Sequence, residues 1–323
     1  MSPAAENVSI ETGSRLHFGL IDPVGSSGRL YAGAGVMVEN PGIRLAAELS
    51  ADGDRIAAEG QITGRVENFI DRFRKCTGCN AHFNIEIASC PADHLGLGTG
   101  TQLGMAISTA CSSLLGLDGG IEAVAGRTGR GRRSAIGVHG FERGGFLVDG
   151  GKTDGQGLST LRARIELPQA WHFILLAAPG YRGLSGQREA DCFEGLKSIP
   201  GQTVSRLENL LDKGLVPAAE QDDWRAFSSA LHEFGLLASE PFQEAQGGPF
   251  STALAAEVAL YLGAEGIEGV GQSSWGPTLY ALLPDRQEAE TRAREIRDRF
   301  SLHAGEVQVT QPRNRGAAVG IPA

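Results

Sequence analysis

The sequence predicts an α+β fold in two lobes, and three observations lead to it. The chain has 323 residues, which exceeds the size at which one hydrophobic core usually stops growing. Its first half is rich in strand-like segments with a few helices, whereas its second half mixes longer helical patterns with strands. A boundary is expected between residues 155 and 168, so we divide the chain into domains 1–160 and 161–323.

In the first half, apolar content broken by glycine or proline predicts strands over residues 8–21, 30–39 and 43–49. Apolar residues at positions 66, 69, 70 and 73 have helical spacing, and Gly78 follows as a stop signal. Residues 83–87 alternate between apolar and polar side chains, which indicates a half-buried strand. Helices are expected over 102–115 and 121–127. Residues 137–151 are expected to form two strands around the turn Gly144-Gly145.

The second half opens with an apolar run over residues 173–178, which suits a buried strand. Helical patterns follow over 204–211, 224–237 and 252–262, and a loop leading into a strand is expected over 269–283. Residues 286–300 form a charge-laced amphipathic helix in this interpretation, and residues 307–310 form a last short strand.

The composition indicates which kinds of partner the protein is expected to lack and in which cell compartment it is expected. A net charge of −9 argues against a nucleic-acid-binding protein, which needs a basic face. No run of about 18 apolar residues is present, so no membrane contact is expected. Residues 1–8 lack the basic head and apolar middle of a secretory signal. The five cysteines, an odd number, suit reduced thiols and a cytoplasmic location, and the one Cys-x-x-Cys pair has no zinc-like partner pair.

A glycine-rich run between residues 96 and 104 follows a strand-like segment and leads into an apolar helix. Glycines let backbone N–H groups crowd around an anion, and a helix start adds partial positive charge. The run is not a Walker A loop, and its last glycine falls one residue late for a dinucleotide fingerprint. A phosphate cradle and a plain tight turn both remain open. The predicted phosphate-binding residues are Gly96, Gly98, Thr99, Gly100, Thr101 and Gln102.

Two basic patches lie on either side of this run. Arg15 and His17 share one face of a predicted strand, which suits a phosphate or carboxylate ligand, although a surface strand has the same pattern. Arginines at positions 127, 130, 132 and 133 alternate with glycines and precede Ser134. A flexible basic loop of this kind can clamp phosphates, and a solvated charge run is the alternative. We include Arg133 and Ser134 among the phosphate-binding candidates.

Two further turns carry candidate residues. Asp149 and Lys152 flank a glycine pair, where a carboxylate and an ammonium could hold magnesium and neutralise a leaving phosphate. A turn salt bridge explains the same pair. Ser273, Ser274 and Trp275 lie in a polar, glycine-rich turn before a strand. Trp275 either stacks on a planar ring or packs between the lobes.

These motifs, in this order, resemble the GHMP superfamily of small-molecule kinases and their relatives. That superfamily carries a Pro-x3-Gly-Leu-Gly-Ser-Ser-Ala phosphate loop. Here Pro91 lies one residue further away, and Thr99-Gly100-Thr101 replaces Ser-Ser-Ala. The second superfamily loop resembles residues 269–277. The resemblance implies an N-terminal ribosomal S5 domain 2-like lobe, a ferredoxin-like C-terminal lobe and a homodimer.

Within the superfamily, six segments together are most similar to the β-ribofuranosylaminobenzene 5′-phosphate synthase family. They are residues 14–18, 98–103, 133–137, 146–151, 272–278 and 313–316. The resemblance implies transfer from phosphoribosyl pyrophosphate to 4-aminobenzoate or 4-hydroxybenzoate. The products are a β-ribofuranosyl-arene 5′-phosphate, CO2 and pyrophosphate, and the reaction uses Mg²⁺. The pathway implied is tetrahydromethanopterin biosynthesis.

The chemistry that this reaction requires suggests roles for individual residues. Arg15, His17, Asp149 and Lys152 are the expected catalytic residues, and Thr99 and Asp149 are the expected metal ligands. The aromatic acid is expected at Ser273, Ser274 and Trp275 with Arg182 or Arg188. An ATP-dependent kinase of a small alcohol is the alternative. Gly137 stands where many of these kinases carry a catalytic aspartate, which weakens that alternative.

Overall fold

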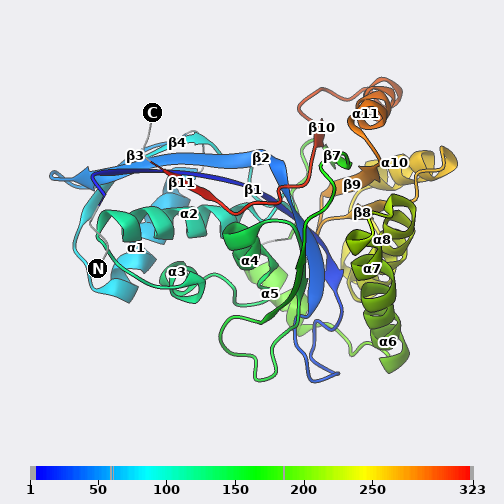
Figure 1. Cartoon of the computed structure of the whole chain (residues 1–323), viewed down its shortest axis with the longest axis horizontal. Helices are drawn as coiled ribbons and strands as arrows, with labels where there is room; N and C mark the ends of the chain where they lie inside the picture. Colours follow the sequence, from blue (N-terminus) through cyan, green and yellow to red (C-terminus); the bar gives the residue numbers. More distant parts are fainter. Residues whose placement is uncertain (1–4, 59, 61, 185, 321–323) are drawn as a thin grey trace.

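The computed structural model describes residues 5–58, 60, 62–184 and 186–320, and it divides the chain between two β-sheets covered by helices (Figure 1). No secretory signal is expected in residues 1–8, and the first four of these residues lie outside the described part of the chain. Within the described residues, no helix is long and apolar enough to cross a membrane. The α+β class predicted from the sequence is confirmed.

The first sheet has the strand order β11-β1-β2-β4-β3, and two further strands extend it from β2. Its long strands are β1 (Asn7–Leu20) and β2 (Gly33–Ser50), followed by β3 (Arg55–Ala57) and β4 (His82–Ser89). The two strands predicted over 30–39 and 43–49 are one strand, because β2 stays paired to β1 on both sides of Pro41. A register shift between Thr12 and Ser14 absorbs the irregularity there.

Four helices cover one face of this sheet (Figure 1). They are α1 (Ile62–Thr77), α2 (Thr99–Leu114), α3 (Ile121–Thr128) and α4 (Ile136–Arg143). The prediction of two strands over 137–151 is wrong, since a helix precedes the single strand β5 (Phe146–Asp149). The glycines there serve close packing: a Cβ on Gly140 would lie 2.5 Å from Met37 Sδ of β2.

The second sheet has the antiparallel order β10-β7-β9-β8. Its strands are β7 (His172–Ala177), β8 (Val270–Gln272), β9 (Thr278–Leu283) and β10 (Val307–Thr310). Two helices, α10 (Ala253–Ala264) and α11 (Arg286–Phe300), pack on it around a separate apolar core. This strand order is the ferredoxin-like arrangement expected for the second lobe.

A run of helices between the sheets joins the two lobes. It comprises α5 (Gly186–Glu194), α6 (Gly201–Asn209), a π-helical turn at Leu210–Leu215, α7 (Val216–Glu220), α8 (Trp224–Ser239), a short turn at Glu240–Phe242 and α9 (Gln243–Gln246). Phe227 of α8 lies 5.4 Å from Phe146 of the first sheet, ring centroid to centroid. One apolar cluster therefore runs from β1 and β5 through α8 to Tyr280 of the second sheet.

The first sheet also takes strands from beyond residue 160. Both β6 (Leu161–Ile165), which pairs with β5, and β11 (Ala318–Gly320), which pairs with β1, belong to it. The division at residues 160 and 161 therefore does not coincide with the division between the sheets. The chain leaves the first sheet after β6 and returns to it at the end.

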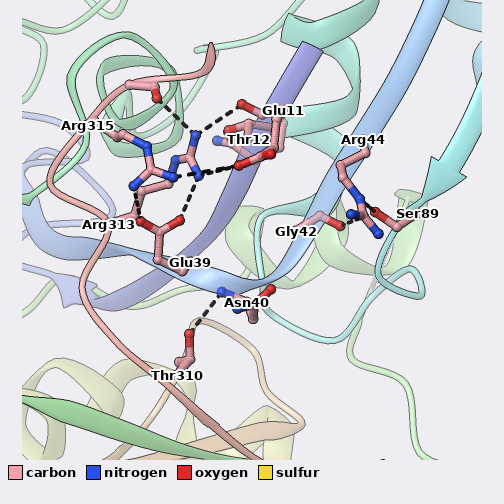
Figure 2. A network of polar contacts seen from close by, with 12 residues as sticks. Glu11, Thr12, Glu39, Asn40, Gly42, Arg44, Ser89, Thr310, Arg313 and Arg315 are labelled. Atoms are coloured by element: carbon pink, nitrogen blue, oxygen red, sulfur yellow. Dashed lines mark hydrogen bonds and ion pairs between the residues drawn. The ribbon is translucent and has the colours of Figure 1, made fainter. Parts of the chain in front are cut away.

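The returning segment is fastened by the basic motif at residues 313–316. Arg313 is 1% exposed and donates from Nη1 to Glu39 Oε2 at 2.7 Å and to Glu11 Oε1 at 3.1 Å. Arg315 also pairs with Glu39, and Figure 2 shows both guanidinium groups facing that carboxylate. Asn314 exchanges two hydrogen bonds with the backbone of Leu167. This motif therefore holds the fold together, away from the glycine-rich run.

Candidate active site

Two adjoining hollows lie around the glycine-rich run. The loop pocket, about 210 Å³, is lined by residues 94–101 together with Arg15, Arg65 and Arg130. The aromatic cavity, about 380 Å³, lies between Arg15 and Arg130 and apolar side chains of α5 and of the helical segments after it. Both hollows share Arg15, Thr101, Arg130, Glu189, Ser274 and Trp275. A ligand that spans the shared wall reaches both.

The glycine-rich run forms the N-terminus of α2. Gly98 is the N-cap, with a left-handed φ of 70°, and its carbonyl accepts from the N–H groups of Thr101 and Gln102. The first amides of a helix have no partner inside it, so those of Thr99 and Gly100, two residues that line the loop pocket, are available as donors to a ligand. Gly96 has another role, because a Cβ there would collide with the carbonyl of Ser273.

Three arginines surround this helix start. A Cβ on Gly98 would lie 3.2 Å from Arg15 Nε, and one on Gly100 would touch Arg65 and lie 3.7 Å from Arg130 Nη1. Arg15 Nε, Arg15 Nη1 and Arg130 Nε are buried without a hydrogen-bond partner in the described part of the chain. Buried donors without partners are costly, so an anion that accepts from them gains that free energy.

The charges of Arg15 and Arg130 are poorly compensated by the protein, whereas Arg65 forms an ion pair with Asp93. Burial lowers the pKa of Arg15 to about 10, which the nearby Glu189 carboxylate partly offsets. Burial, together with repulsion from Arg65, Arg72 and Arg132, lowers the pKa of Arg130 to about 10. Both groups still carry their charge at neutral pH. A bound polyanion would relieve the repulsion and restore hydrogen bonds at the same time.

His17 joins Arg15 in the lining of the aromatic cavity, as the shared strand face predicted. Its side chain is buried, and burial, followed by the charge of Arg15, holds its pKa well below the usual 6.5. The ring is therefore neutral at pH 7 and able to accept a hydrogen bond or a proton. Its backbone N–H donates to Ser273 Oγ at 3.0 Å, and its carbonyl accepts from the Ser274 N–H at 3.1 Å.

Three aromatic rings form an apolar wall of the cavity. Trp275 packs edge-on against Phe242 with centroids 4.7 Å apart and against Phe193 at 5.5 Å. The Arg133 guanidinium lies 4.0 Å from the centroid of the Phe193 ring and pairs with Glu189 at 2.5 Å. Flat apolar walls beside a cationic edge suit a planar aromatic ligand with a negative charge.

Comparison with known proteins decides the family, although no protein-family model matches the chain. The chain is 31% identical to the β-ribofuranosylphenol 5′-phosphate synthase of Archaeoglobus fulgidus, over 97% of this chain and 99% of the relative. It is 30% identical to the synthase of the same name from Methanothermobacter thermautotrophicus, over 95% and 97%. The chain belongs to the β-ribofuranosylphenol 5′-phosphate synthase family. It is an enzyme, a pentosyl-type glycosyltransferase of that family.

Solved structures confirm the fold of this synthase-family chain. Homoserine kinase from Cytophaga hutchinsonii superposes with a TM-score of 0.68 at 16% identity, covering 99% of both chains. Mevalonate diphosphate decarboxylase from Staphylococcus aureus gives 0.67 at 11% identity, covering 97% of this chain and 98% of that one. The GHMP kinase-like two-lobed fold predicted from the motifs is therefore confirmed.

Two predicted catalytic residues of the synthase, Asp149 and Lys152, lie outside the lining of both hollows. Lys152 Nζ donates to the carbonyls of Gly131 and Arg132, each at 2.8 Å. Asp149 accepts from the N–H groups of Ala135 at 2.6 Å and Gly151 at 2.9 Å, and from Ser134 Oγ at 3.1 Å. Both side chains hold residues 130–133, the arginine loop, in place, because their polar atoms bond to this loop and to residues next to it.

The predicted metal ligands Thr99 and Asp149 are not brought together. Thr99 lines the loop pocket, whereas Asp149 lines neither hollow and its carboxylate accepts from the Ala135 N–H. Among the residues the structure describes, no group of three or more His, Cys, Asp or Glu side chains could hold a metal. Glu189 is the carboxylate that lines both hollows. This donor set fits Mg²⁺ only if phosphate oxygens supply most of its ligands.

Some of the other predicted site residues line the aromatic cavity, and others are buried and support its surroundings through hydrogen bonds. Thr101, Arg133, Ser134, Ser274 and Trp275 line the aromatic cavity. Gln102 and Ser273 are buried supports: Gln102 Nε2 donates to the Gly137 carbonyl at 2.7 Å, and Ser273 Oγ donates to the Gly96 carbonyl at 2.7 Å. Arg182 and Arg188 line neither hollow, and Arg188 is exposed on α5.

Sequence reasoning missed Arg65, Glu189 and Phe193 as site residues. Arg65 lies in the first turn of α1, where a basic side chain in an amphipathic helix resembles any solvated arginine. Glu189 and Phe193 lie one turn apart on α5, a helix that was not predicted because its sequence carries no buried stripe. Their spacing of four places them on one face, but only the packing of α5 brings that face to the cavity.

Proposed function

We propose that this enzyme joins phosphoribosyl pyrophosphate to a para-substituted benzoate. The products are a β-ribofuranosyl-arene 5′-phosphate, CO2 and pyrophosphate, and the step belongs to tetrahydromethanopterin biosynthesis. The observation that supports this most is the unpartnered, buried guanidinium group of Arg15 beside the glycine-rich run, because it suits a polyanion at the wall shared by both hollows. The names of the relatives support a ribosylated phenol as the product.

The two hollows fit the two ends of this reaction. The loop pocket combines helix-start amides with Arg15, Arg65 and Arg130, a set suited to a leaving diphosphate. Arg132 and Arg133 line the aromatic cavity from the neighbouring loop and suit the 5′-phosphate. The aromatic wall around Trp275 suits the benzoate ring. Because Arg15 and Arg130 border both hollows, the sugar between these groups lies next to the ring.

The proposed chemistry needs no covalent enzyme intermediate. The bond between ribose C1′ and the diphosphate oxygen breaks, and its electron pair leaves with pyrophosphate, where the arginines neutralise the developing charge. The ring carbon that bears the carboxylate forms a bond to C1′, drawing electrons from the para substituent. CO2 then departs, and the electron pair of its bond returns to the ring and restores aromaticity.

We propose that Mg²⁺ accompanies the diphosphate. Bound there, the ion would supply additional positive charge to the leaving group. Glu189 is the residue that would contact it, with phosphate oxygens as the remaining ligands. Glu189→Gln should then raise the Mg²⁺ concentration needed for half-maximal activity, which a magnesium titration of the initial rate measures.

A kinase reaction is less well supported by the site. The residue at the position of the usual kinase aspartate is Gly137, and a Cβ there would lie 3.1 Å from Thr101 Cγ2. A larger side chain at this point would press on the helix that carries the glycine-rich run. The geometry therefore disfavours a base at position 137.

The test is a release assay with carboxyl-labelled acceptors. The enzyme is incubated with phosphoribosyl pyrophosphate, Mg²⁺ and either labelled 4-hydroxybenzoate or labelled 4-aminobenzoate. We expect labelled CO2 and pyrophosphate in equal amounts. Arg130→Met should lower kcat/KM for the donor at least about a hundredfold, since it removes a charged donor from the leaving group.

The control is Arg127→Met, which removes a charge from the same basic segment. Arg127 is directed elsewhere, donating to Ser112 Oγ and to the Asp118 carbonyl, so its removal should leave kcat/KM within about threefold. Absence of labelled CO2 with both acceptors, in the wild-type enzyme, would exclude the proposed reaction.

A further inference from the structure

The segment between Gly183 and Ile199, which contains α5, borders both hollows. Leu184 lines the loop pocket, Phe193 lines the aromatic cavity, and Glu189 lines both. If the enzyme has the proposed function, the sugar of the donor lies where the two hollows meet, between the diphosphate and the aromatic ring. The inference below rests on that proposed function.

Helix α5 stands between these hollows and the solvent. Glu189 and Phe193 lie one turn apart on one face of the helix, and both are half-buried residues that line the aromatic cavity. The opposite face is open to solvent, with exposed side chains at Gln187, Arg188, Asp191 and Glu194. A shift of α5 would therefore let water reach the place where the hollows meet.

This wall is fastened at its two ends but has no core of its own. The Gly183 N–H donates to the His94 carbonyl at 2.8 Å, and Ile199 belongs to the apolar cluster that runs between the two sheets. Between these ends, no residue that the structure describes is buried. Contacts made by half-buried side chains of α5 must therefore hold the helix over the hollows.

Phe193 fastens α5 to four other parts of the chain. Its ring packs edge-on against Tyr31, in the loop between β1 and β2, with centroids 6.3 Å apart. Phe242 lies 5.8 Å and Trp275 5.5 Å from it, centroid to centroid. The Arg133 guanidinium lies 4.0 Å from the ring centroid. The Phe193 ring therefore fills the point where α5 meets the β1–β2 loop, the arginine loop and the aromatic wall.

We propose that Phe193 keeps water from ribose C1′ and so makes the enzyme specific for the aromatic ring as its nucleophile. When the diphosphate leaves, C1′ becomes electron-poor, and either the ring carbon or a water molecule can bond to it. If water attacks, its oxygen bonds to C1′ and its proton passes to solvent. Ribose 5-phosphate and pyrophosphate then form without CO2. A site closed to water prevents this side reaction.

The test measures CO2, pyrophosphate and ribose 5-phosphate in one reaction. The enzyme is incubated with phosphoribosyl pyrophosphate, Mg²⁺ and labelled 4-hydroxybenzoate or 4-aminobenzoate. The wild-type enzyme should release CO2 and pyrophosphate in equal amounts. Phe193→Ala removes the ring and leaves a gap on the solvent side, so pyrophosphate should exceed CO2 at least about twofold. Ribose 5-phosphate should account for the difference.

Phe300→Ala is the matched control. Phe300 is also half-buried, with the Tyr261 ring edge-on at 6.1 Å and the Arg299 guanidinium 6.0 Å from its centroid. It lies at the end of α11 in the second lobe and lines neither hollow. This variant should therefore still release CO2 and pyrophosphate in equal amounts.

A second variant disturbs Phe193 without changing the lining of either hollow. Tyr31 lines neither of them, and Tyr31→Leu removes the ring that packs edge-on against Phe193. Pyrophosphate should again exceed CO2, by a smaller factor than in Phe193→Ala. Tyr31 acts here as a positioning residue. A merely structural role of either ring would lower both products together and leave their amounts equal.

Failure of this inference and failure of the proposed function give different results. Equal amounts of CO2 and pyrophosphate from a folded Phe193→Ala enzyme overturn the inference while the reaction stands, and so does the loss of both products. If Phe193→Ala does not fold, Tyr31→Leu decides in the same way. No CO2 from the wild-type enzyme with either acceptor removes the proposed function itself. Excess pyrophosphate in both variants, with Phe300→Ala unchanged, supports the role of Phe193.

Discussion

Replacement of Gly98 by alanine isolates the contact between the glycine-rich run and Arg15. Gly98 has a left-handed φ of 70°, which costs an alanine about 1–2 kcal/mol. The added Cβ would also lie 3.2 Å from Arg15 Cβ and Nε, so the arginine must shift. A hydrogen bond to a charged group contributes about 1.5–3 kcal/mol, so its loss weakens diphosphate binding by about tenfold or more.

Gly78→Ala is the matched control, because Gly78 has a φ of 72° and no atom within 4 Å of the added Cβ. Denaturant unfolding should show a similar loss of stability in both variants, about 1–2 kcal/mol. Calorimetric titration with pyrophosphate and Mg²⁺ should show weaker binding only for Gly98→Ala. Wild-type affinity in Gly98→Ala would refute the assignment of Arg15 and the glycine-rich run to the anion site.

Three further predictions concern the supports of the site. Arg313→Met removes a buried guanidinium from Glu39 and should lower the free energy of unfolding by about 3 kcal/mol, measured with denaturant. Lys152→Met leaves two carbonyls of the arginine loop unpaired and should raise the donor KM more than it lowers kcat, in steady-state assays. His17 stays neutral when folded, so protonation favours the unfolded chain below pH 6.5. His17→Asn should therefore reduce the loss of stability between about pH 6.5 and about pH 5, by up to about 1.4 kcal/mol per pH unit.

Local patterns predicted the elements whose periodicity is undisturbed. The helix over 286–300 and the strand over 307–310 are confirmed at their predicted bounds, and α2 begins three residues earlier than expected. The pattern failed at residues 136–143, where a strand was expected before the turn at Gly144-Gly145 and the helix α4 forms instead. Gly137 and Gly140 lie instead where the helix meets Thr101 and Met37, a closeness that no local pattern reveals.

The types of polar side chain in the sequence predicted the site residues less well than the spacing of the glycines did. Asp149 and Lys152 resemble a catalytic pair because a carboxylate and an ammonium flank bare backbone. Their actual partners are backbone groups of residues 131–135 and 151, brought together by the return of the chain through β5. Whether a polar side chain faces a ligand or a carbonyl depends on packing, which sequence spacing does not encode.

The amino-acid sequence by itself determined the α+β class, the glycine-rich helix start and the resemblance to a ribosyl-transferring family, because these depend on local periodicity, backbone freedom and motif order. Tertiary structure decided which arginines converge. Arg15, Arg65 and Arg130 come from a strand, a helix and a loop that are distant in the chain. The buried, unpartnered donors of Arg15 and Arg130 arise only when those elements pack together.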